Sequence, residues 1–126
     1  MNKIVNTTNA PAPIGPYSQA VIANGFLFLS GQVAINPVNG EVVLSSVAEE
    51  TQQVMRNIKA VLLEAGYGFE DVVKTTIFLS DMTLFGEVND IYGSYFESTF
   101  PARETVAVKG LPKGVNVEIS MTAHKA

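Results

Sequence analysis

Arg103 is the side chain whose type and place in the sequence best fit the binding of a carboxylate. It is one of two arginines in 126 residues, and it follows Pro101 where a strand is predicted to begin. A planar guanidinium held by a strand can bind a carboxylate through two parallel hydrogen bonds, which a lysine cannot reproduce. The alternative is a surface arginine paired with Glu104 or Glu118. We take Arg103 as the leading candidate for a ligand anchor and leave the alternative open.

Glu118 is the candidate for orienting water or moving a proton. It lies in the middle of a predicted strand between apolar neighbours, so partial burial could raise its pKa and let it position or deprotonate a water molecule. The alternative is an ordinary solvated carboxylate. Tyr17, Ser30, Lys74 and Asn89 are weaker candidates, because single polar groups of this kind are common at turns and strand ends.

The sequence lacks the motifs of cofactor and metal enzymes. It has no phosphate loop, no dinucleotide glycine pattern, no paired metal ligands and no serine hydrolase motif. Cysteine is absent, and the one histidine, His124, lies two residues from the C-terminus. We therefore predict neither a metal nor a cofactor. A site of this kind is limited to intrinsically easy chemistry, such as hydrolysis of an activated C=N bond through a carboxylate clamp and oriented water.

Composition narrows the class of protein further. A chain of 126 residues with 47% hydrophobic residues can bury one core, so we predict a single domain over residues 1–126. The net charge of −4 and the lack of a basic run disfavour a nucleic-acid partner. No segment has the length and hydropathy of a signal peptide or a membrane span, so we expect a cytoplasmic protein without a membrane partner.

The first half of the chain predicts strands followed by one long helix. Residues 20–23 and 26–33 are strand-like and flank Asn24-Gly25, a strong hairpin signal, and residues 41–44 form a short extended piece. Ser46 and Glu49 have capping-box spacing, and an apolar stripe then runs to a predicted C-terminal cap at Gly66. The opposite face is predicted to meet water. It carries Glu50, Gln53, Arg56, Lys59 and Glu64.

The second half predicts a strand, a helix and two closing strands. Residues 72–79 are β-branched, and Asp81 can cap a helix that carries an aromatic stripe and ends before Pro101. Residues 105–108 and 115–123 complete the pattern. This order predicts an α+β fold with one mixed β-sheet and both helices packed on one face. Because the other face of the sheet also carries apolar residues, we expect copies of the chain to cover it in a homo-oligomer.

With these residues in place, the sequence resembles the Rid family, the reactive intermediate or imine deaminases also called YjgF-type proteins. The resemblance spans essentially the whole chain in one order and spacing. The matching stretches are Ala10-Pro11, Gly15-Pro16-Tyr17-Ser18-Gln19-Ala20, Phe28-Leu29-Ser30-Gly31-Gln32, the capped helix through Asn57, Val72-Val73-Lys74-Thr75-Thr76, Val88-Asn89, Tyr95-Phe96, Phe100-Pro101-Ala102-Arg103, Leu111-Pro112 and Val117-Glu118-Ile119.

The resemblance implies a chorismate-mutase-like subunit in a homotrimer with its sites between subunits. It implies that Arg103 binds the carboxylate of 2-iminobutanoate or 2-iminopropanoate, that Glu118 helps to place the attacking water, and that hydrolysis gives a 2-keto acid and ammonia. The positions implied to line the cleft are Tyr17, Ser30, Gly31 and Asn89. Deaminase members commonly have cysteine where this sequence has Thr105, so the wall of the cleft keeps a small residue but changes polarity.

Two other functions remain open at the level of sequence. The same arginine could serve a non-catalytic regulator that binds 2-keto acids or amino acids, which ligand-dependent stabilisation without turnover would reveal. A ribonuclease or translation inhibitor is also attached to this family. The sequence pI of about 4.8, the absence of a basic patch and the lack of a histidine pair disfavour that function.

Overall fold

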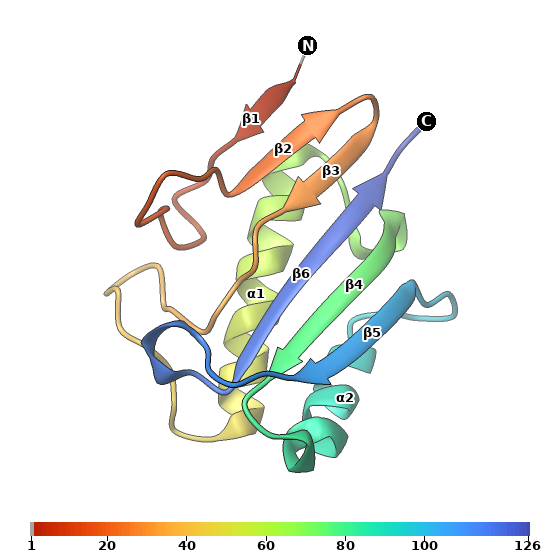
Figure 1. The fold of residues 1–126 in the computed structure, drawn as a ribbon. Coiled ribbons are helices and arrows are strands. Elements are labelled where there is room, and N and C mark those ends of the chain that lie inside the picture. The colour runs from red at the N-terminus through yellow and green to blue at the C-terminus, as the bar shows by residue number, and fades with distance from the viewer. Residues whose placement is uncertain (1) are drawn as a thin grey trace.

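The computed structural model describes residues 2–126 and has one mixed sheet with two α-helices on one side. The six strands lie in the order β1-β2-β3-β6-β4-β5, and all neighbours are antiparallel except β4 and β5. Figure 1 looks onto the face of the sheet that carries no helix, with α1 and α2 behind it. The strands and helices are β1 (Lys3–Val5), β2 (Ala20–Ala23), β3 (Phe26–Leu29), α1 (Val47–Ala65), β4 (Val72–Leu79), α2 (Phe85–Gly93), β5 (Ala102–Ala107) and β6 (Val117–His124). The predicted α+β class and the placement of both helices are confirmed.

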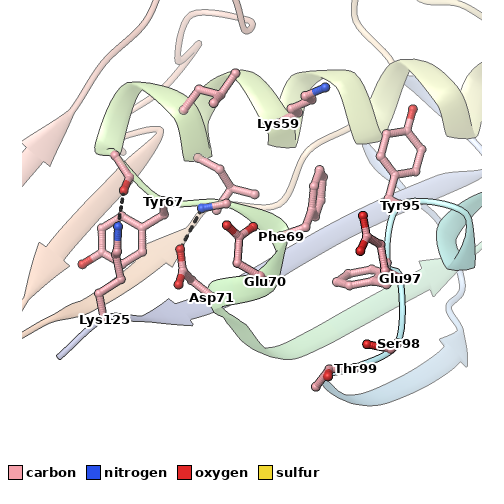
Figure 2. A pocket seen from close by; sticks show the side chains of 15 residues that line it. Lys59, Tyr67, Phe69, Glu70, Asp71, Tyr95, Glu97, Ser98, Thr99 and Lys125 are labelled. Carbon is pink, nitrogen blue, oxygen red and sulfur yellow. Dashed lines mark hydrogen bonds between the residues drawn. The ribbon is translucent and has the colours of Figure 1, made fainter.

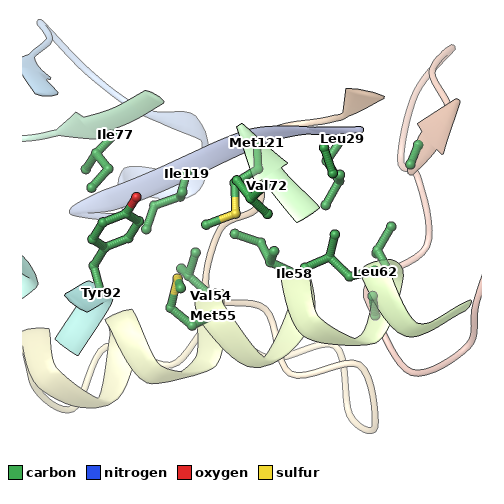
Figure 3. Close-up of a cluster of buried hydrophobic side chains, with 14 of the residues drawn as sticks. Leu29, Val54, Met55, Ile58, Leu62, Val72, Ile77, Tyr92, Ile119 and Met121 are labelled. Carbon is green, nitrogen blue, oxygen red and sulfur yellow. The ribbon is translucent and has the colours of Figure 1, made fainter. Parts of the chain in front are cut away.

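The core lies between α1 and the sheet. Val54, Ile58 and Leu62 of α1 point at the strands in Figure 3, opposite Ile119 and Met121 of β6, and all five are almost completely buried. Alternate residues of β6 therefore face the helices, and the residues between them face the open side of the sheet. No helix among residues 2–126 is long and apolar enough to span a bilayer.

The first hairpin and the long helix follow their local signals. Asn24 and Gly25 both have positive φ, as the predicted tight turn requires. Ser46 Oγ accepts a hydrogen bond from the Glu49 amide at 3.0 Å, and Gly66 ends the helix at φ 81°. In the left-handed region a glycine avoids the steric cost of a Cβ.

The prediction that one side of this helix faces water is partly wrong. Glu50 is 0% exposed and Gln53 is 8% exposed, whereas the other three residues are exposed as predicted. These three are Arg56, Lys59 and Glu64. Glu50 is hydrogen-bonded to Asn116 and Val117 in a distant segment, and Gln53 to Asn57 one turn further along the helix, which offsets much of their desolvation. Glu50 in particular accepts hydrogen bonds from Asn116, a contact that no local pattern in the helix sequence predicts.

Several element boundaries differ from those predicted. β3 ends at Leu29 rather than continuing to residue 33, because the Ser30 hydroxyl turns back to donate to the Ser18 carbonyl at 2.6 Å. Gln32 then rejoins the sheet at a single bridge with Ile119, and residues 41–44 likewise form only one bridge, through Val42.

The second helix is shorter and its flanking strands are shifted. Asp81 caps a 3₁₀ turn rather than α2 itself, and α2 ends at Gly93 instead of continuing towards Pro101. The chain leaves the helix at Ser94, whose hydroxyl donates to the Ile91 carbonyl at 2.6 Å, and Phe96 packs on the Tyr92 ring with centroids 5.0 Å apart. β5 begins at Ala102, three residues earlier than predicted, β6 begins at Val117, two residues later, and β1 was not predicted from its three residues.

Candidate functional site

Arg103 lies on edge strand β5 and turns towards α2. Its Nη1 donates a hydrogen bond to Asn89 Oδ1 at 2.7 Å. Its guanidinium carbon lies 5.2 Å from the centroid of the Tyr92 ring and 5.4 Å from that of Phe85. Stacking on two aromatic faces favours a cation, and the amide fixes the rotation of the guanidinium. Arg103 is therefore an oriented cation at the protein surface.

The alternative of a paired surface arginine does not hold for this chain. Glu104 forms its ion pair with Lys74, with Nζ and Oε1 3.1 Å apart, and no ion pair of Arg103 is formed with any of residues 2–126. Burial raises the pKa of the Tyr92 phenol, so the ring beside Arg103 stays neutral and does not cancel its charge. The guanidinium keeps donors that can bind an anion from outside the chain.

Thr105 lies two residues beyond Arg103 on the same side of β5. It is in register with Ile77 of β4, a buried residue that faces the helices. Its Oγ1 is buried and has no hydrogen-bond partner among residues 2–126. The hydroxyl thus points into the protein, and the polar change from cysteine to threonine is hidden from the surface. We call Asn89, Arg103 and Thr105 the Arg103 group.

Glu118 lies on the other face of the sheet. It alternates with Val117 and Ile119, which face the helices, and it is in register with Phe78 of β4. Its side chain lies against Gly31, so closely that a Cβ at position 31 would come within 2.9 Å of the carboxyl carbon. Glycine at position 31 is what makes room for the carboxylate. Burial raises the pKa of Glu118, the direction that suits a group receiving a proton.

Tyr17 and Ser30 lie on the two segments that adjoin Gly31. The Ser30 hydroxyl donates to the Ser18 carbonyl, and the Ser30 amide donates to the Gln19 carbonyl at 3.0 Å. Tyr17 is half-exposed, and its hydroxyl accepts a long hydrogen bond of 3.4 Å from the Ile14 amide. We call Tyr17, Ser30, Gly31 and Glu118 the Glu118 group, because contacts along the chain and across these segments connect them.

The two groups do not meet within one chain. Arg103 is in register with Thr75, and Thr75 with Met121, both of which are buried against the helices. Glu118 is three positions from Met121 along β6 and therefore points to the opposite face. The six-stranded sheet separates Arg103 from Glu118. Sequence reasoning identified both residues but could not reveal this separation.

A groove of about 850 Å³ lies elsewhere, between the end of α1, the turn at residues 69–71 and the segment at residues 95–99. In Figure 2 the rings of Phe69 and Tyr95 lie below the helix that carries Lys59, and Glu97 lies below Tyr95. The groove contains neither Arg103 nor Glu118. It therefore does not join the predicted site residues.

The sequence prediction missed several residues that hold the candidate site. Phe85 and Tyr92 belong to the aromatic stripe predicted for the second helix, and both also stack on Arg103. Glu50 was expected to meet water and Asn57 was given no role, yet both are buried. Val54 lies four residues after Glu50 and three before Asn57, a spacing that places all three on one face of the helix. That spacing is the signal that could have identified them.

Comparisons with known proteins place the chain in a family. The model of the family described as Endoribonuclease L-PSP matches residues 7–125. A mouse protein named 2-iminobutanoate/2-iminopropanoate deaminase is 46% identical over 98% of this chain and 91% of its own. A Lactococcus lactis protein, provisionally named as a regulator, AldR, is 50% identical over 97% of each chain.

Solved structures agree with the sequence relatives. A Thermotoga maritima protein, provisionally named as an endoribonuclease, superimposes with a TM-score of 0.97 and 44% identity over 100% of this chain and 99% of its own. The three names differ, but the fold and nearly the full length are shared. The chain belongs to the endoribonuclease L-PSP family, the YjgF-type or Rid family that the sequence motifs indicated.

Proposed function

We propose that this protein hydrolyses 2-imino acids, such as 2-iminobutanoate and 2-iminopropanoate, to 2-keto acids and ammonia. The observation that carries the proposal is Arg103, an exposed guanidinium that is oriented by Asn89, stacked on two rings and free of any carboxylate partner in the described chain. Relatives at 44–47% identity named 2-iminobutanoate/2-iminopropanoate deaminase support the substrate class.

In the proposed reaction Arg103 binds the substrate carboxylate and thereby fixes the adjacent C=N carbon. Glu118 accepts a proton from water as the oxygen attacks that carbon, and the proton passes to the nitrogen. The tetrahedral intermediate then expels ammonia and leaves the 2-keto acid. Tyr17, Ser30, Gly31 and Asn89 line the cleft, and Thr105 forms its wall. The scheme uses only side chains of this protein, with no metal or cofactor.

The site needs two copies of the chain. Because the sheet separates the Arg103 group from the Glu118 group, a substrate that touches both must lie between the Arg103 group of one copy and the Glu118 group of another. A contact between unlike surfaces closes into a ring. We propose the homotrimer that the family resemblance implies, with a chorismate-mutase-like arrangement and the helix-free face of the sheet turned inwards.

Complementation between two inactive variants tests both the reaction and the shared site. Imine is generated in situ with semicarbazide competing for it, and formation of 2-ketobutanoate is measured. Arg103→Ala and Glu118→Ala should each abolish the acceleration. After subunit exchange at equal amounts, about a quarter of the sites should combine an intact Arg103 with an intact Glu118 and regain activity.

The outcomes separate the two parts of the proposal. If the wild type gives no acceleration, the deaminase function is wrong. If the wild type is active but the mixed variants stay inactive after confirmed exchange, the site does not span two copies. Near-normal turnover by Arg103→Ala would remove Arg103 from the mechanism.

A metabolite-binding regulator is the second candidate, favoured by the regulator name of the Lactococcus lactis relative. Arg103 would then bind 2-keto acids or amino acids without turnover. Thermal unfolding distinguishes the two, because a regulator should be stabilised by 2-ketobutanoate while the wild type fails to accelerate imine hydrolysis. We do not propose ribonuclease activity, since a net charge of −4 opposes the binding of a polyanion.

A further inference from the structure

Besides Thr51, whose hydroxyl is bonded within the helix, helix α1 carries three buried polar side chains, which lie on one side of it. Glu50 and Asn57 are 0% exposed and Gln53 is 8% exposed. Spacings of three and four residues place them in one row along the helix. A row of apolar side chains would fill this space at less desolvation cost, and replacing buried ionic groups by apolar ones is often neutral or stabilising. The row therefore calls for an explanation beyond stability.

Glu50 holds the segment that leads into Glu118. Its Oε2 accepts hydrogen bonds from the Asn116 amide at 2.7 Å and the Val117 amide at 3.0 Å. Its Oε1 accepts from Asn116 Nδ2 at 2.9 Å. One buried carboxylate thus fixes the backbone of the two residues directly before Glu118, from the face of the sheet opposite to the Glu118 side chain.

Asn57 holds the segment that leads out of Gly31. Its Nδ2 donates to the Val33 carbonyl at 3.1 Å and to the Ile35 carbonyl at 3.0 Å. Its Oδ1 accepts from Gln53 Nε2 at 2.9 Å, which fixes the orientation of the amide. Two side chains, about two turns apart on one helix, therefore form hydrogen bonds to the segments next to Gly31 and Glu118.

These two segments pair with each other at a single β-bridge. The Gln32 amide donates to the Ile119 carbonyl at 2.8 Å, and the Ile119 amide donates to the Gln32 carbonyl at 3.1 Å. Because β3 ends at Leu29, this bridge is an isolated one between β6 and the segment after Gly31. The segment after Gly31 therefore has one bridge to β6, whereas β6 itself is paired with β4 on both sides of Glu118. The hydrogen bonds from Asn57 add support to the less paired of the two segments.

We propose that Glu50 and Asn57 are positioning residues. By tying two segments to the same helix, α1, they fix the position of the Glu118 carboxylate relative to Gly31. The inference rests on the proposed function, because the consequence of misplacement is a loss of turnover. Displacement of a reacting group by about 1 Å can cost about a hundredfold in rate. The role is indirect, since neither side chain reaches the open face of the sheet.

Turnover by the assembled protein tests this role with Glu50→Ala, Glu50→Gln and Asn57→Ala. Glu50→Ala and Asn57→Ala should lower kcat by roughly 10- to 100-fold and change KM by less than about threefold, because Arg103 still binds the carboxylate. Glu50→Gln should recover most of kcat, since its carbonyl oxygen can accept both backbone bonds. The control is Val61→Ala, which destabilises the same helix by leaving a cavity and removes no hydrogen bond to either segment.

Amide hydrogen exchange gives a readout that does not depend on activity. In Glu50→Ala the Gln32 and Ile119 amides should exchange faster than in the wild type. The increase should exceed that in Val61→Ala, which reports only a global loss of stability. Gln53→Met, which keeps the side-chain volume and removes only the support of the Asn57 amide, serves if Glu50→Ala does not fold. It should show the same effects more weakly.

Equal kcat in Glu50→Ala, Asn57→Ala and Val61→Ala, with exchange that follows stability alone, would overturn the positioning role. That result is distinct from failure of the proposed function, in which the wild type itself produces no 2-keto acid. In that case the exchange experiment still decides whether α1 holds the Gly31 to Glu118 contact.

Discussion

At the scale of single residues, Arg103 and Glu118 are prepared in different ways. Arg103 remains exposed and is oriented by an amide and two rings. Glu118 is half-buried against Gly31, and its pKa is raised by burial. A permanent cation suits the binding of a carboxylate, and a carboxylate with a raised pKa suits proton transfer. These surroundings support the proposed division between a binding group and a proton-transferring group.

The raised pKa of Glu118 predicts a distinct dependence of stability on pH. The native chain keeps this proton to higher pH than the unfolded chain, so the free energy of unfolding falls as pH rises through the window between the ordinary and the raised pKa. Glu118→Gln removes that titration. Its stability relative to the wild type should therefore increase as the pH rises above the ordinary range of a carboxyl group, measured by urea unfolding. A constant difference would show that burial does not perturb Glu118.

Thr105 gives a prediction that separates structure from chemistry. Its buried Oγ1 lacks a partner in the described chain, and an unsatisfied hydroxyl of this kind costs about 1–3 kcal/mol. Thr105→Val should therefore raise the free energy of unfolding by about 1 kcal/mol and leave turnover within about threefold of the wild type. Chemical denaturation and the imine assay check both parts. A tenfold loss of turnover would show that the hydroxyl reaches the substrate.

At the scale of elements, α1 both builds the core and carries the polar row that grips two distant segments. Its ends are set by local chemistry, with Ser46 capping the first turn and Gly66 accepting the left-handed conformation. Helix α2 instead orients Arg103, since its residues Phe85, Asn89 and Tyr92 all contact the guanidinium. Each helix thus supports one of the two groups of site residues.

Glycine substitutions in the two helices should have opposite effects. Gly66→Ala places a Cβ at φ 81° and should destabilise the protein by about 1 kcal/mol. Gly86→Ala, inside α2, meets open space and should stabilise it by about 0.5–1 kcal/mol. Thermal unfolding of the pair provides its own control. The same sign for both would contradict the assigned role of Gly66 as the cap of α1.

At the scale of the whole molecule, the helix-free face of the sheet is the surface that association would cover. Ile4, Phe26, Phe28 and Val106 are exposed although they are large and apolar, and each alternates along its strand with residues that face the helices. The open face, which Figure 1 shows from the front, thus carries exposed apolar side chains on β1, β3 and β5 beside polar ones such as Glu118. Exposed apolar surface of this kind marks an interaction site.

A charge placed on this face should dissociate the proposed homotrimer without unfolding the chain. Phe28 is 49% exposed and points away from the core, so Phe28→Glu should yield folded monomers that lack activity. Leu63→Glu, at a 64% exposed position on α1, is the matched control and should remain assembled. Sedimentation equilibrium with circular dichroism checks both. An assembled, active Phe28→Glu variant would place the interface elsewhere.

The sequence by itself determined the elements and the candidate side chains. The cap residues of α1, the turn at Asn24-Gly25, the β-branched run of β4 and the alternation in β6 are local signals that act over a few residues. They predicted the fold class well, and the family motifs brought Arg103 and Glu118 forward. Boundaries were less accurate where a side chain contacts a distant segment, as Ser30 does at Ser18 and Phe96 at Phe69.

Only the tertiary structure decided what those side chains face. Glu50 was predicted to meet water, yet it is buried because donors 66 residues away, at Asn116, come to lie above it. Arg103 and Glu118 are both strand residues, and only the pairing of β4 with β5 and β6 shows that they point to opposite faces. The physical reason is that periodicity fixes the direction of a side chain relative to its own strand or helix, whereas its partner is fixed by how these elements pack together.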